Sequence, residues 1–168
     1  DGIDDLTDTA PLDETAGDTV DPVFGSLTDY VQEATGVNTV VNLPQPTVTD
    51  NSGLIDSITS DYSGPLALGE YTVTWTATDA QGNQATAQQT VTVVDTVGPV
   101  IDPVLPLLLD ARGQYTDISA DIVSTANDVV DGAVTVEVQG ESKLIAGTHI
   151  VRLISTDSSG NSTTTDLS

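Results

Sequence analysis

Residues 69–94 show the clearest alternation of hydrophobic and polar positions in the chain. Every second residue from 71 to 77 is hydrophobic, and threonine fills the positions between them. A turn-like segment, 79–83, follows, and hydrophobic residues spaced for one face return over 87–93. A period of two, rich in β-branched residues, is typical of β-strands. We therefore expect a long β-hairpin with one buried face.

The chain repeats itself at an offset of 77 or 78 positions. The matching pairs include Leu66 and Leu144, Gly69 and Gly147, Val73 and Val151, Asp79 and Asp157, Gly82 and Gly160, and Asn83 and Asn161. Self-similarity at a nearly constant offset indicates tandem domains. We expect an acidic N-terminal arm or linker over residues 1–18 and domains over 19–95, the first repeat, and 96–168, the second repeat.

Both repeats contain several short strand-like segments separated by turn signals. Polar turns are predicted at 49–53 and 127–132, and each repeat closes with the hairpin pattern. This spacing favours an all-β chain of two antiparallel β-sandwiches. Helix is plausible only over 27–34, with 117–124 ambiguous, so we expect little or no helix.

The two ends of the chain leave alternatives open. Ser168 aligns with Thr90, but no residues match the strand positions 91–94 that follow in the first repeat. The last strand of the second repeat is therefore either truncated or completed by another chain, because an open sheet edge invites strand addition. At the other end, the acidic arm is either a solvated linker or a strand lent to a neighbouring copy, with Ile3 and Leu6 as its apolar contacts.

The charge balance excludes two classes of partner. The chain has 26 acidic residues against 3 Lys and Arg, a net charge of −23. Binding to nucleic-acid phosphates needs clustered basic residues, and anionic membrane surfaces repel such a chain for the same reason. Divalent cations or high ionic strength would relieve its self-repulsion. These conditions favour an extracellular setting.

The residue types offer no catalytic constellation. The chain has no Cys and one His, His149, which aligns with Tyr71 at a strand position. Thiolate chemistry and zinc sites of clustered His and Cys are therefore excluded, and no base is evident for a nucleophilic Ser. One Trp, one Phe and four Tyr are too few for an aromatic-lined sugar cleft. We expect a non-enzymatic protein.

Calcium is the cofactor that the acidic residues favour. Its ligands are carboxylate, amide and backbone oxygens, and the hairpin turns and the repeat boundary supply such groups. The candidate ligands are Asp79, Asn83, Asp95, Asp102, Asp157 and Asn161. The polar turns at 50–51 and 128–131 could approach the same end of a sandwich. In the alternative interpretation, Asp and Asn in these turns bond only their own backbone.

Three segments carry a resemblance to a known family. Residues 72–83, 98–101 and 127–132 resemble the hyalin-repeat (HYR) family and related bacterial immunoglobulin-like repeats. The resemblance covers about residues 19–168, although Leu153 replaces Trp75 in the second repeat. It implies immunoglobulin-like sandwiches in extracellular, multi-repeat adhesion proteins, and it implies no active site.

These observations together predict an extracellular structural or adhesion protein, most plausibly bacterial. Its tandem modules would act as a rod-like extender of a surface protein. One alternative is a filament subunit polymerised by strand donation between copies, and another is an accessory module of a secreted enzyme. The expected partners are neighbouring domains or copies of the chain, together with an unidentified surface ligand.

Overall fold

The computed structural model describes residues 17–168 and contains only β-strands, turns and irregular segments there. This confirms the all-β prediction. The expectations for the acidic arm lie outside the described residues, except for its last two positions. In the described part of the chain, no helix has the length and hydrophobicity needed to cross a membrane.

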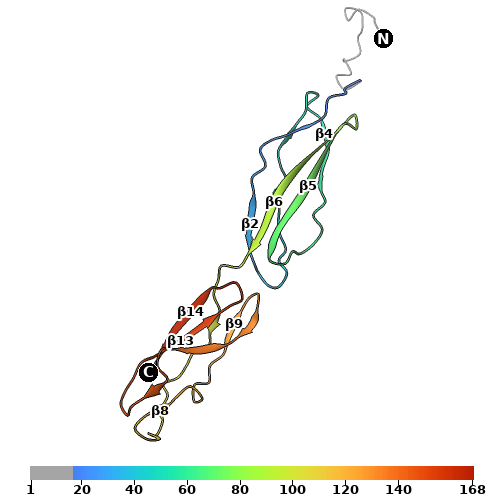
Figure 1. The fold of residues 1–168 in the computed structure, drawn as a ribbon. Helices are drawn as coiled ribbons and strands as arrows, with labels where there is room; N and C mark the ends of the chain where they lie inside the picture. The colour runs from blue at the N-terminus through green and yellow to red at the C-terminus, as the bar shows by residue number, and fades with distance from the viewer. Residues whose placement is uncertain (1–16) are drawn as a thin grey trace, which may run out of the picture. The chain divides into compact units, whose positions relative to one another are not determined.

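The first repeat builds two sheets (Figure 1). Its strands are β1 (Val23–Phe24), β2 (Tyr30–Glu33), β3 (Val48–Thr49), β4 (Ile55–Ser60), β5 (Gly69–Asp79) and β6 (Gln84–Val94). The larger sheet has the order β2-β6-β5-β4, and the smaller one pairs β1 with β3. The segment 27–34 therefore contributes β2 rather than a helix, because β2 pairs with β6 at the edge of the larger sheet.

The long strands β5 and β6 form the expected hairpin. Burial alternates along both strands, and Val73, Ala77, Val91 and Val93 are at most 3% exposed. Trp75 belongs to the same buried face. Its indole N–H donates a 3.0 Å hydrogen bond to the Gln89 side chain, which in turn donates 2.8 Å to the Thr28 carbonyl. These bonds satisfy two buried polar groups in an otherwise apolar layer.

The second repeat builds three sheets from shorter strands. They are β7 (Val100–Ile101), β8 (Thr116–Asp117), β9 (Ala126–Asp128), β10 (Gly132–Val134), β11 (Val136–Gln139), β12 (Lys143–Leu144), β13 (Val151–Thr156) and β14 (Ser162–Leu167). The sheet orders are β10-β9-β7, β11-β13-β14 and β12-β8. Its buried core is aliphatic and consists of Ile118, Val151, Leu153 and Leu167. Leu153, at the position of Trp75, is fully buried.

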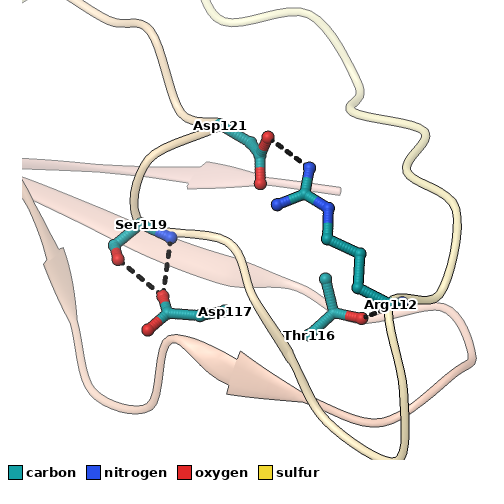
Figure 2. Close-up of polar contacts among 5 residues, drawn as sticks. All are labelled: Arg112, Thr116, Asp117, Ser119 and Asp121. Carbon is teal, nitrogen blue, oxygen red and sulfur yellow. Dashed lines mark hydrogen bonds and ion pairs between the residues drawn. The ribbon is translucent and has the colours of Figure 1, made fainter.

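A network of side-chain bonds shapes the ambiguous segment 117–124 (Figure 2). The Asp117 carboxylate accepts bonds from the Ser119 amide at 3.1 Å and from its hydroxyl at 2.5 Å. These bonds lower the pKa of Asp117 below its usual value of 3.8. Nearby, Arg112 donates to Asp121 at 2.6 Å, and its amide donates to the Thr116 hydroxyl at 3.0 Å. Because Asp117 bonds the backbone locally, the segment turns instead of forming a helix.

The described residues gather into two compact units. One contains 17–30, 42–64 and 70–92, and the other contains 31–41, 65–69 and 93–168. Each sheet takes its strands from a single repeat. The functional residues discussed below are assigned to these units where they are introduced.

The buried Leu153 provides a test of the aliphatic core. We expect Leu153→Ala to lower the free energy of unfolding by about 2–5 kcal/mol, because the change leaves a cavity among β13, β14 and Ile118. Leu108→Ala is the matched control, since Leu108 is 97% exposed and its truncation should change stability by no more than about 0.5 kcal/mol. Denaturant unfolding followed by circular dichroism measures both. Equal effects of the two substitutions would contradict the assignment of the core.

The β13–β14 hairpin also predicts a pH effect. Arg152 donates to Asp166 at 2.8 and 3.2 Å across the hairpin, which lowers the pKa of Asp166 below 3.8. A carboxyl group whose pKa is lower in the folded state stabilises the fold above its unfolded pKa and loses that contribution as pH falls through the folded value. We expect Arg152→Gln to return the pKa of Asp166 toward 3.8, as measured by carboxyl NMR titration. An unchanged titration would contradict the ion pair.

Candidate metal centres

Two groups of three aspartates bring their carboxylates together. The first acidic cluster consists of Asp18, Asp50 and Asp79, and the second acidic cluster consists of Asp95, Asp128 and Asp157. In each cluster one carboxylate oxygen from every member lies within 4.8 Å of the others. Each cluster lies wholly within one compact unit.

The two clusters occupy equivalent positions in the repeats. Asp95 lies 77 positions after Asp18, and Asp128 and Asp157 lie 78 positions after their counterparts in the first cluster. The same offsets relate the repeats along the sequence. The chain therefore builds one arrangement of acidic side chains twice.

A hairpin turn with the pattern Asp-x-x-x-Asn positions one member of each cluster. Asp79 ends β5, and its carboxylate accepts hydrogen bonds from the amides of Gln81 at 2.8 Å and Asn83 at 2.9 Å. The Asn83 side chain donates to the other carboxylate oxygen at 2.7 Å. Asp157 and Asn161 repeat this turn, with amide and side-chain bonds of 2.7 and 2.9 Å. The turns therefore fix each carboxylate in orientation.

The same asparagines also fix the residue that precedes each repeat. The Asn83 side chain donates to the Asp18 carbonyl at 3.2 Å, and the Asn161 side chain donates to the Asp95 carbonyl at 3.1 Å. Each asparagine thus joins two acidic residues through its NH₂ group. In this arrangement Asn83 and Asn161 act as donors that hold the clusters together.

Hydrogen bonding keeps the first cluster ionised. Asp79 is 1% exposed, and this burial raises its pKa, but the bonds from Asn83 and the turn amides outweigh burial and lower the pKa below 3.8. The Ser52 hydroxyl and amide, at 2.5 and 2.9 Å, lower the pKa of Asp50 in the same way. Negative charge therefore accumulates in the cluster at neutral pH.

The first cluster also contains carboxylate oxygens without a donor. Among the described residues, no group donates a hydrogen bond to Oδ2 of Asp18 or to Oδ2 of Asp50, although both atoms are buried. A buried anionic oxygen without a partner is costly. Oxygens of this kind are ligands that calcium prefers, so the donor set fits a hard divalent cation.

The second cluster is better supplied with donors. Asp128 accepts bonds from the amides of Val130 at 2.7 Å and Asp131 at 3.0 Å. The Ser159 hydroxyl donates to Oδ2 of Asp95 at 3.3 Å. Asp131 lies outside the cluster, where its carboxylate accepts bonds from the amide and hydroxyl of Ser158. The three carboxylates of the cluster nevertheless converge as they do in the first.

The structure thus brings together some of the predicted ligands and adds others. Asp79, Asp95 and Asp157 are cluster members, whereas Asp102 lies elsewhere, hydrogen-bonded to Thr125. The clusters also include Asp50 and Asp128 from the predicted polar turns, and Asp18 from the acidic arm. The signal for Asp18 was its offset of 77 from Asp95.

His149 lies apart from both clusters. It is exposed, and its Nε2 atom is 2.9 Å from the Ile145 carbonyl oxygen. In the described part of the chain, the hydrogen bonds of this imidazole involve no serine hydroxyl. Its placement is that of a surface residue beside a loop.

Comparison with known sequences identifies relatives among adhesins. The chain is 32% identical over 162 residues to "Serine-rich adhesin for platelets" of Staphylococcus aureus strain N315, an alignment that covers 89% of this chain and 7% of that protein. The protein of the same name in strain MRSA252 is 31% identical, with 11% of its length covered. The chain therefore spans about a tenth or less of the length of these relatives.

Comparison with solved structures gives distant matches to cadherin ectodomains. The protocadherin γB4 extracellular domain matches with a TM-score of 0.39 and 14% identity over 87% of this chain and 31% of that one. Human CDH23 EC21-23 matches with a TM-score of 0.37 and 13% identity over 88% of this chain and 63% of that one.

A family comparison matches residues 18–93 to the HYR domain. The matched region includes the β5–β6 hairpin and all three members of the first acidic cluster. It confirms the resemblance that the sequence pattern indicates. Through residues 18–93, this chain belongs to the HYR domain family.

Proposed function

We propose that this chain is a non-enzymatic extender segment of a bacterial surface adhesin. The observation that carries the proposal is the identity of 32% to an adhesin over 89% of the chain. The HYR match supports an extracellular location. In this role the two repeats are tandem β-sandwich modules that hold a binding region away from the cell.

Each acidic cluster is, in this proposal, a calcium site. Three carboxylates within 4.8 Å of one another repel, and a divalent cation between them converts that repulsion into attraction. The buried Oδ2 atoms of Asp18 and Asp50 support the first site, since both lack a hydrogen-bond donor. The positional equivalence of the clusters supports a second site of the same kind.

Calcium would act mechanically at these positions. Asp95 directly follows β6, Asp128 ends β9, and Asp157 directly follows β13. An ion held by all three would restrain the backbone where one repeat passes into the next along the sequence. The first cluster would restrain Asp18, at the entry to the first repeat, in the same way. A series of such restraints would stiffen an extender.

Thermal unfolding with calcium or EDTA tests both sites. We expect calcium to raise the unfolding midpoint by about 5 °C or more, because an ion that binds only the folded state stabilises it. Asp18→Asn combined with Asp95→Asn should abolish this shift, because Asn removes one anionic ligand from each cluster while keeping an oxygen acceptor. Asp102→Asn is the control with the same change of chemistry outside the clusters, and it should leave the shift intact.

Sodium chloride at matched ionic strength separates binding from charge screening. A chain of net charge −23 is stabilised by any added salt. If sodium chloride reproduced the full calcium shift, or if the Asp102→Asn variant lost it as well, the calcium sites would be rejected.

Small-angle X-ray scattering and light scattering test the extender role. We expect a monomer whose scattering narrows to a single extended form when calcium is added, because the restrained backbone samples fewer conformations. The double variant, Asp18→Asn with Asp95→Asn, should remain in its calcium-free state. Growth of long polymers that survive EDTA would contradict the extender and favour the alternative of a filament subunit.

A further inference from the structure

An apolar groove lies in the second repeat beside the end of β14. Its volume is about 450 Å³. The side chains that line it include Leu107, Leu109, Ile118, Leu144, Val151 and Leu167. Ile118, Val151 and Leu167 belong to the buried core of the repeat, and Leu109 and Leu144 pack against that core. One side of the core is therefore covered only by the rim of this groove.

The first repeat shows what occupies the equivalent place. There β6 continues through Val94 between β2 and β5, and Val91 and Val93 are 0% and 2% exposed. In the second repeat the corresponding strand, β14, ends at Leu167, which aligns with Gln89. The groove thus lies where the first repeat has the second half of β6.

Both segments beside the groove have lost the strand conformation of their counterparts. Residues 107–110 align with β2 but form no strand, and residues 147–150 align with the start of β5 but precede β13. As a result β13 has 6 residues where β5 has 11. The strands are shortened on each side of the position that lacks a partner strand.

The backbone beside the groove retains the first bond of the missing pairing. The Leu107 amide donates to the Ser168 carbonyl at 3.2 Å. In the first repeat the Ala34 amide donates to the Val94 carbonyl at 2.7 Å, at the far end of the equivalent pairing. Within the described residues, no acceptor for the Leu109 amide is found. A strand placed in the groove would find backbone partners on both sides.

We propose that this groove binds an extended peptide strand with β-branched apolar residues at alternate positions. The strand runs on in the direction of β14 between residues 107–110 and 147–150. Two of its side chains take the places that Val91 and Val93 take in the first repeat. This inference rests on the comparison between the two repeats and is independent of the calcium sites.

A synthetic peptide with the sequence of residues 89–96, Gln-Thr-Val-Thr-Val-Val-Asp-Thr, tests the proposal on the intact chain. We expect the fluorescein-labelled peptide to bind saturably by anisotropy, and to slow hydrogen exchange of residues 107–110 and 147–150. A peptide with serine in place of Val91 and Val93 should bind at least about tenfold more weakly, since it lacks the apolar anchors. Equal binding of the two peptides, or no binding at 1 mM, would overturn the proposal.

Two substitutions locate the peptide. Leu109→Asp places a charge in the groove and should weaken binding at least about tenfold. Leu105→Asp makes the same change four residues earlier, at a side chain that is 82% exposed, and should leave binding within about twofold. Equal effects of the two substitutions would overturn the assignment to the groove.

A covalent version keeps the test valid if Leu109→Asp unfolds the chain. Val-Thr-Val-Val added after Ser168 should raise the unfolding midpoint by about 5 °C or more and should prevent the peptide from binding. Ser-Thr-Ser-Val added at the same place is the control and should do neither. If the first extension left both the midpoint and peptide binding unchanged, the groove would not be a strand site. Self-association that the peptide reverses would support the site, with the strand then supplied by a second copy.

Discussion

The hydrogen bonds between an aspartate and the asparagine four positions later are the interaction on which both repeats depend. Asp79 and Asn83 close the β5–β6 turn through three bonds between side chain and backbone or side chain and side chain, and Asp157 and Asn161 do the same between β13 and β14. The turn fixes the register of each hairpin, and the register decides which side chains are buried. Because the asparagine also bonds the carbonyl of the preceding acidic residue, one local turn links hairpin, repeat entry and acidic cluster.

Much of the fold follows from patterns that the sequence displays directly. The alternation over 69–94 is long enough to predict both strands and their buried face, and the HYR resemblance and the all-β class are confirmed. Strands of two residues, such as β1 and β8, are too short for periodicity to reveal. The segment 27–34 has a composition compatible with helix, but pairing beside β6 makes part of it a strand. Long-range pairing of this kind is not encoded locally.

The acidic clusters could be predicted in part for a similar reason. Asp79 and Asp157 lie in a recognisable turn, and Asp95 lies at the repeat boundary, so spacing alone marks them. Asp18 lies among so many acids that composition assigns it to the arm, and only its equivalence to Asp95 distinguishes it. The two arginines of the chain lie in ion pairs with Asp121 and Asp166, outside the clusters. Positive charge that balances the clusters must therefore come from solution.

The replacement of Trp75 by Leu153 has a consequence for spectroscopy. Trp75 is the only tryptophan of the chain, and its indole is buried in the sheet of the first repeat. Emission excited at the red edge of protein absorbance therefore reports the surroundings of that sheet alone. Circular dichroism in the far ultraviolet records the strands of both repeats. Recording the two signals on one sample would separate the unfolding of the halves without cutting the chain or adding a label.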